Sequence, residues 1–208
     1  MSIPQGEPSY WQAAKIHLRT CDSTMKDLID EFEEPPLRSH GRLFETLARA
    51  IVGQQISAKA ADAVWGRLLE LIKTAEPSCV LEQTPEALRS VGLSGRKVEY
   101  IQSLAERADW LSHQPWSTMS DKDVIKQLCT LRGIGPWTAE MMLIFTLLRP
   151  DVLPLGDIGV VRCIEKLYAG GQALDEAQLL KIAEPWRPYR TVGVWYLWRY
   201  LDAEPVLY

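Results

Sequence analysis

The sequence predicts an all-α protein, and three observations lead to this fold class. Apolar residues recur at helical spacing in several segments, as in 43–71 and 158–167. Alternating strand-like patterns and Asn-Gly turns are missing from the sequence. Helix-starting residues precede the periodic segments, and glycine or proline follows them. The 208 residues, of which 47% are hydrophobic, suffice for one domain or two small lobes.

The N-terminal part of the chain is expected to hold several short helices. They cover residues 10–18, 25–32 and 43–71. Ser23 is a plausible cap for the second of them, and the first seven residues show no sign of a tether. Pro35-Pro36 ends this helix, because the residue before a proline disfavours helical backbone angles. The segment 43–71 is expected to break or bend around Gly53-Gln54-Gln55.

Further helices are expected after residue 80. Thr84-Pro85-Glu86 starts one, because threonine suits the N-cap and proline the first helical position, and it ends near Gly92. The next helix begins near Ser94 and runs toward Leu111. After a proline-containing connection, Ser120 caps another helix, with Asp123 in the position of a capping box.

The helix after Ser120 must stop at Gly133-Ile134-Gly135. The two glycines allow positive φ and bring bare backbone close to whatever lies outside. Pro136 suits the first turn of the next helix, where its missing N–H costs nothing. The free N–H groups of such a turn predict an anion site, at which a nucleic-acid phosphate needs no side chain.

This helix, glycine turn and second helix resemble the helix-hairpin-helix DNA-binding motif, here within about residues 120–148. The downstream acid Asp157, in Leu-Pro-Leu-Gly-Asp, extends the resemblance to the helix-hairpin-helix DNA glycosylases. Within that superfamily the chain is most similar to the DNA-3-methyladenine glycosylase II branch, over roughly residues 40–202.

The resemblance implies a single compact catalytic unit, residues 1–208, with two helical lobes and DNA across the cleft between them. The N- and C-terminal helices, about 1–40 and 150–208, are expected to form one lobe. Residues 41–149 are expected to form the other.

The resemblance also implies hydrolysis of the N-glycosidic bond of alkylated bases, of the 3-methyladenine and 7-methylguanine type, in base excision repair. Asp157 matches the family's catalytic aspartate, and it also suits the N-cap of the following helix, so both roles can coexist. A carboxylate there would stabilise positive charge on the sugar as the base departs. It could also orient or deprotonate the attacking water.

Trp137 bears on the reaction type. In relatives with lyase activity, a lysine at this place attacks the sugar as an amine, which tryptophan cannot do. We therefore expect a monofunctional hydrolase that leaves an abasic site and does not cut the strand.

The target base must leave the duplex, so a pocket is needed to receive it. Trp137 is expected as one wall, and Trp198 falls at the family's base-stacking tryptophan; an indole face attracts a cationic base. Core packing is the alternative for such aromatic residues. Gln54 is expected at the mouth of the pocket, and Met141 and Ile158 stand where some relatives carry tyrosines.

Gln55 matches the residue that wedges into the base stack in the family; the alternative is a polar interruption in a buried helix pair. Phosphate contacts are expected at Gly133 and Gly135. The turn 92–99 parallels 133–140, so a second phosphate contact is expected at its polar residues, unless it is simply a solvated cationic turn. These residues are Ser94, Arg96 and Lys97.

No required cofactor is expected. By resemblance, the backbone carbonyls of Cys129, Leu131 and Ile134 would hold a sodium or potassium ion that bridges to a phosphate, and hard cations do prefer oxygen ligands. The four cysteines are widely scattered, which argues against an iron–sulfur cluster and for reduced thiols.

The net charge of −4 counts mildly against nucleic acid, although backbone amides and a few local cations can form a compact footprint. No apolar run is long enough for a bilayer, and the N-terminus lacks a secretion signal. We therefore expect a soluble cytoplasmic monomer whose partner is double-stranded DNA with a damaged base. Two alternatives stay open: a non-catalytic DNA-binding module in which Asp157 is only a cap, and a glycosylase for a neutral oxidised or mismatched base.

Overall fold

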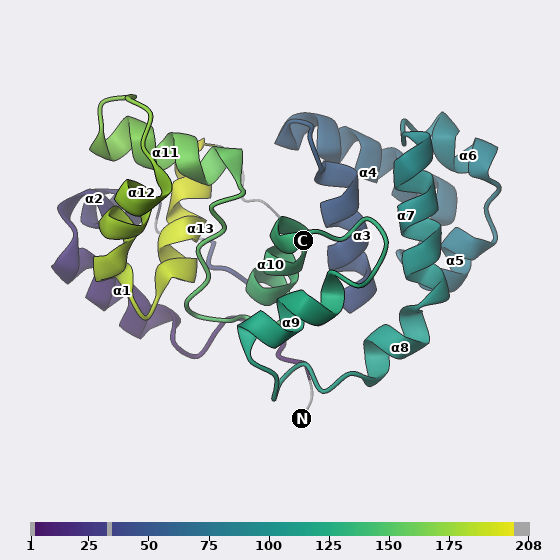
Figure 1. The fold of residues 1–208 in the computed structure, drawn as a ribbon, viewed down its shortest axis with the longest axis horizontal. Helices are drawn as coiled ribbons and strands as arrows, with labels where there is room; N and C mark the ends of the chain where they lie inside the picture. The colour runs from purple at the N-terminus through teal and green to yellow at the C-terminus, as the bar shows by residue number, and fades with distance from the viewer. Residues whose placement is uncertain (1–2, 33–34, 202–208) are drawn as a thin grey trace. The chain divides into compact units, whose positions relative to one another are not determined.

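Helices form all the regular secondary structure in the residues that the computed structural model describes, 3–32 and 35–201 (Figure 1). Within these ranges the one extended pairing is an isolated bridge between Gly6 and Ser39. The all-α prediction is confirmed. The ends of the expected terminal lobe, residues 1–2 and 202–208, lie outside the described residues.

The chain divides into two compact units. The first, called the middle unit below, is essentially Gly41–Leu147. The second, called the terminal unit, combines Pro4–His40 with the chain from Leu148 onward. In the described part of both units, no helix has the length and apolar character that crossing a membrane requires.

The middle unit is built around α3 and α10, whose side chains are buried almost all round, as expected for central helices. Helix α3 contacts α4, α7, α8 and α10. Between α3 and the end of α10, the Thr146 hydroxyl donates to the Thr46 hydroxyl at 2.8 Å, which satisfies two polar groups in the core. The helices are α3 (Leu43–Gly53), α4 (Ala58–Ile72), α5 (Pro77–Leu81), α6 (Pro85–Ser90), α7 (Gly95–Glu106), α8 (Ala108–His113), α9 (Asp121–Leu128) and α10 (Pro136–Phe145).

Local capping signals correctly placed the starts of α6, α7 and α9. Thr84 accepts the Ala87 N–H at 3.2 Å at the start of α6, as expected. The helix expected to run toward Leu111 is instead two helices, because Arg107 leaves helical geometry with φ −100° and ψ 11° between α7 and α8. Helix α5 was not predicted, since five residues are too few to show a helical period.

The terminal unit brings together helices from both ends of the chain. In Figure 1 the purple α1 and α2 lie beside the green and yellow α11–α13. Helix α13 contacts α1, α2 and α11, and its residues 191–199 are buried without interruption. Trp11 of α1 stacks on Tyr196 with ring centroids 6.0 Å apart. The bounds are α1 (Trp11–Cys21), α2 (Ser23–Glu31), α11 (Ile158–Tyr168), α12 (Glu176–Ala183), the 3₁₀ helix η1 (Glu184–Trp186) and α13 (Arg190–Leu201).

Two expectations for the N-terminal segment were wrong. The segment around Gly6 is tethered, because Gly6 and Ser39 exchange backbone hydrogen bonds of 2.8 and 3.0 Å. Asp22, and not Ser23, caps α2, since its carboxylate accepts the Met25 N–H at 3.0 Å. A sequence holding both residues in a row does not tell which one takes the cap.

Asp22 also joins three elements of the terminal unit. Its Oδ2 accepts the Tyr168 hydroxyl of α11 at 2.9 Å and the indole N–H of Trp186 in η1 at 2.8 Å. Burial and the neighbouring Asp22 both raise the pKa of Tyr168, so the hydroxyl remains a donor. One carboxylate therefore satisfies donors from α2, α11 and η1.

We expect Asp22→Ala to lower the free energy of unfolding by about 2–4 kcal/mol, because it removes a helix cap and leaves two donors unsatisfied. The matched control Ser23→Ala should change it by less than about 0.5 kcal/mol. Chemical denaturation of both variants checks this. Equal effects would mean that the cap has been assigned to the wrong residue.

Candidate functional site

The hairpin between α9 and α10 spans residues 129–135 and is closed by short-range backbone hydrogen bonds. The N–H groups of Leu131 and Ile134 donate to Leu128 O at 2.9 Å and to Leu131 O at 3.2 Å. Gly133 has φ +82°, whereas Gly135 has φ −101°. Only Gly133 therefore uses the left-handed backbone that the sequence suggested for both glycines.

The two glycines face different surroundings. A Cβ on Gly133 would overlap the ring of Tyr100, so this α7 residue packs directly against the hairpin. A Cβ on Gly135 would meet nothing within 4 Å. Gly133 thus allows close internal packing, and Gly135 leaves the hairpin backbone open to an approach from outside. No local sequence signal pointed to Tyr100.

Gly135 is also the N-cap of α10, and Pro136 is its first residue. The first N–H groups of a helix have no intrahelical acceptor and lie at the positive end of its dipole. Gly135 has no side chain to cover the backbone here. Because the Pro136 nitrogen carries no proton, the donors left for an anion are the N–H groups of the residues that follow it. Such a turn can bind an anion, as the sequence predicted.

The turn after α3 contains the expected wedge. Helix α3 ends at Gly53, and Gln55 is exposed with φ +60°, a left-handed conformation that is uncommon outside glycine. The side chain of Gln54 donates from Nε2 to Gly133 O at 2.8 Å and to Thr138 Oγ1 at 3.0 Å. Gln54 therefore ties the turn to the hairpin, a contact that sequence reasoning missed.

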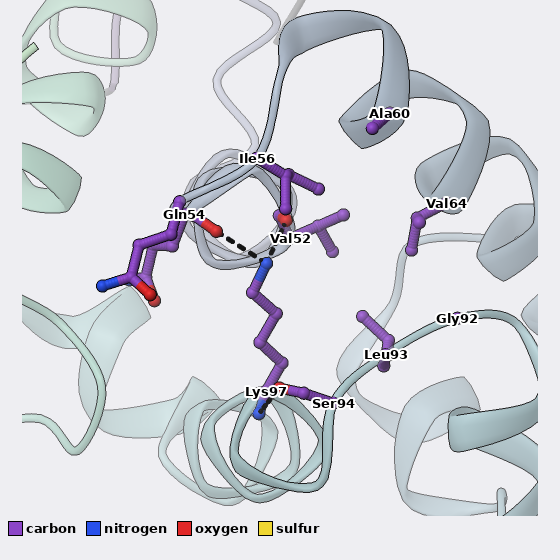
Figure 2. A pocket seen from close by; sticks show the side chains of 10 residues that line it. Val52, Gln54, Ile56, Ala60, Val64, Gly92, Leu93, Ser94 and Lys97 are labelled. Carbon is purple, nitrogen blue, oxygen red and sulfur yellow. Dashed lines mark hydrogen bonds between the residues drawn. The ribbon is translucent and has the colours of Figure 1, made fainter. Parts of the chain in front are cut away.

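The second turn predicted to hold a phosphate, before α7, is arranged differently. Ser94 caps α7 by accepting the Lys97 N–H at 3.3 Å. The ammonium of Lys97 donates inward to Val52 O at 2.7 Å and Gln54 O at 2.8 Å (Figure 2). Burial lowers its pKa. Of the two cationic side chains expected to face phosphate, Arg96 is exposed and Lys97 is turned into the protein.

The pocket residues of the middle unit lie at different depths. Trp137 is half-buried at the start of α10, with Cη2 3.9 Å from where a Cβ on Gly53 would be. Its indole therefore lies against the end of α3. Met141, one turn further along α10, is only 1% exposed and packs in the core of the unit.

Asp157 is in the terminal unit, where it caps α11. Its Oδ1 accepts the Val160 N–H at 2.9 Å, and its own N–H donates to Pro154 O at 2.9 Å. The expected cap is therefore confirmed. A Cβ on Gly159 would stand 3.0 Å from Oδ1, so this glycine leaves room for the carboxylate, which sequence reasoning had not noticed.

Two other expected pocket residues belong to the same unit. Ile158 follows Asp157 directly and is 66% exposed. Trp198 lies on α13 and is 7% exposed. The Cys163 thiol, which donates to Leu197 O at 3.3 Å, holds α11 against α13. The terminal unit therefore holds Asp157, Ile158 and Trp198, and the middle unit holds Gln54, Gln55, Trp137 and Met141.

The carbonyls expected to hold a monovalent cation lie in the hairpin. Leu131 O already accepts the Ile134 N–H, which uses one of its two lone pairs. Among residues 3–32 and 35–201, no three His, Cys, Asp or Glu side chains gather as a metal-ligating group.

Comparison with known proteins shows the family to which the chain is similar. The sequence profile of the HhH-GPD superfamily base excision DNA repair proteins matches residues 48–188, which include the hairpin and Asp157. DNA-3-methyladenine glycosylase 1 of Schizosaccharomyces pombe is 32% identical over 195 residues, and the alignment covers 89% of this chain and 86% of that protein.

Two solved structures resemble this one in fold and sequence. The Schizosaccharomyces pombe 3-methyladenine DNA glycosylase Mag1, solved in complex with abasic DNA, has a TM-score of 0.80 at 30% identity over 90% of this chain and 95% of that one. A DNA-3-methyladenine glycosidase from Bacillus halodurans has a TM-score of 0.70 at 34% identity over 97% and 93%. The chain belongs to the HhH-GPD superfamily of base excision DNA repair proteins.

Proposed function

We propose that this protein is a monofunctional DNA glycosylase of the DNA-3-methyladenine glycosylase II type, which acts as a monomer on alkylated bases in double-stranded DNA. Asp157 carries the proposal: a carboxylate fixed at the start of α11, in a chain whose relatives are named 3-methyladenine glycosylases. The lesions that fit best are 3-methyladenine and 7-methylguanine.

The hairpin would hold the DNA strand. Gly135 leaves the first turn of α10 open, so backbone N–H groups can donate to a phosphate there. The carbonyls of Cys129, Leu131 and Ile134 offer the oxygen ligands that suit sodium or potassium, which would add positive charge beside that phosphate. A grip made by the backbone also fits a chain with a net charge of −4.

Opening of the duplex would fall to Gln55, whose exposed side chain projects from the turn after α3. The half-buried indole of Trp137 can stack on an extruded base, and its electron-rich face favours a cationic alkylated base. Trp198 is nearly buried. We propose that it contacts the base because it matches the base-stacking tryptophan of the family.

Asp157 would act on the sugar. As the C1′–N bond breaks, its electron pair leaves with the alkylated base, which becomes neutral and needs little help from an acid. The carboxylate stabilises the positive charge left on the sugar, accepts a proton from the attacking water, and the water oxygen bonds to C1′. Because the Val160 N–H holds Oδ1 in place, the charge is oriented before the reaction begins.

No strand cleavage is proposed. Cleavage by this superfamily's lyase route would need an amine that forms a covalent imine with the sugar. The corresponding position, Trp137, has none.

We expect Asp157→Asn to reduce release of 3-methyladenine and 7-methylguanine by about 100-fold or more, because it removes the negative charge. Asparagine caps helices as well as aspartate, so the free energy of unfolding should change little. Single-turnover base release and denaturation measure the two effects. If Asp157 is only a cap, Asp157→Asn will remain active and only Asp157→Ala will be impaired, through lost stability. Strand nicking, or trapping of the wild type by borohydride, would contradict the monofunctional mechanism.

The hairpin glycines should separate folding from DNA binding. Gly133→Ala should destabilise the protein by at least about 1–3 kcal/mol, because alanine is strained at positive φ and its Cβ would overlap Tyr100. Gly135→Ala should fold almost normally and bind duplex DNA more weakly, because its Cβ points into the open approach. Thermal unfolding and fluorescence-anisotropy titration check both. Unchanged DNA affinity in Gly135→Ala would remove the hairpin from the interface.

A further inference from the structure

We propose that Lys97 is a positioning residue that holds the Gln54-Gln55 turn in the shape required for opening the base stack, and that it is not a phosphate ligand. This rests on the proposed function, in which Gln55 enters the DNA. It replaces the sequence-based expectation that Lys97 faces DNA.

The first argument concerns carbonyl groups at the end of α3 that have no donor within the helix. The last carbonyls of an α-helix lack intrahelical donors. At the end of α3, the Lys97 ammonium supplies donors to Val52 O at 2.7 Å and to Gln54 O at 2.8 Å. In Figure 2 its side chain extends from α7 straight to these two oxygens. A lysine engaged in this way directs its charge into the protein.

The second argument is the backbone of Gln55. A left-handed residue other than glycine is strained and persists only where its surroundings impose that conformation. Here Gln54, the residue before it, is held on two sides: its carbonyl by Lys97 and its side chain by Gly133 O and Thr138 Oγ1. These contacts fix the chain just where Gln55 takes φ +60°.

The third argument is the open space beside the turn. On the side of Lys97, a pocket of about 360 Å³ separates the turn from the connection between α6 and α7 (Figure 2). Val52, Ile56 and Leu93 line it together with Lys97. Packed side chains do not fill this space, and on this side the two hydrogen bonds of Lys97 connect α7 to the turn.

Helix α7, which carries Lys97, is itself held by two contacts. The Ser94 cap fixes the Lys97 backbone, and three residues along the same face of α7 the Tyr100 ring packs against Gly133. Helix α7 therefore fixes the wedge turn and the hairpin at once. Arg96, on the same helical turn, is exposed and provides the contrast.

The test compares Lys97→Met, which keeps an apolar stem but has no donors, with Arg96→Met. Base release is measured on 3-methyladenine in a paired duplex and in an unpaired bulge, and DNA affinity is measured against salt concentration. Lys97→Met should lose about 10- to 100-fold on the duplex and clearly less on the bulge, where the base is already unstacked. Its salt slope should equal that of the wild type. Arg96→Met should lower the slope by about 0.9, the value for one lost phosphate contact.

Three results would overturn the proposal: a fall of about 0.9 in the salt slope of Lys97→Met, equal losses on both substrates, or wild-type rates on both. If Lys97→Met does not fold, NMR of the lysine ammonium groups in the wild type decides. The Lys97 signal should be protected from solvent exchange in the free protein and unchanged by DNA; protection only with DNA would refute the assignment. A wild type that releases no alkylated base would refute the proposed function, while the NMR result would still decide the role of Lys97.

Discussion

Two carbonyl groups at and just beyond the end of α3, those of Val52 and Gln54, accept hydrogen bonds from outside this helix, and these bonds connect it to α7. Lys97 reaches across from α7 to these two oxygens. Gln54 extends the same network to the hairpin by donating to Gly133 O. One hydrogen-bonded network therefore holds both the turn that carries Gln55 and the hairpin. Its donors are the Lys97 ammonium and the Gln54 amide, and its acceptors are backbone carbonyls and the Thr138 hydroxyl.

In the proposed mechanism, one carboxylate of the terminal unit both caps a helix and acts on the sugar. At Asp157 the helix-capping bond from the Val160 N–H restricts the side chain. Preorganised charge is more effective in catalysis than charge that must be reoriented during the reaction. Helix capping and catalysis are therefore compatible roles for the aspartate at this position, and only a substitution that preserves the cap separates them.

Much of the fold could be predicted because its signals are local. Thr84 and Ser120 lie one residue before their helices, and both caps are found in the structure. The missed contacts join residues far apart in the chain, which no local pattern encodes. Lys97 bonds to carbonyls 45 and 43 residues away, and Asp22 binds the Trp186 indole 164 residues away. Motifs in the sequence therefore suggested candidate site residues, whereas no motif suggested the long-range contacts that they make.

The most direct measurement is a crystal structure of Asp157→Asn bound to duplex DNA that contains an uncleavable 3-methyladenine analogue. The account predicts an extruded nucleotide with C1′ a few ångströms from the side chain of residue 157, and a phosphate on the N–H groups at the start of α10. A nucleotide that stays stacked in the duplex, or a phosphate bound away from Gly135, would contradict it.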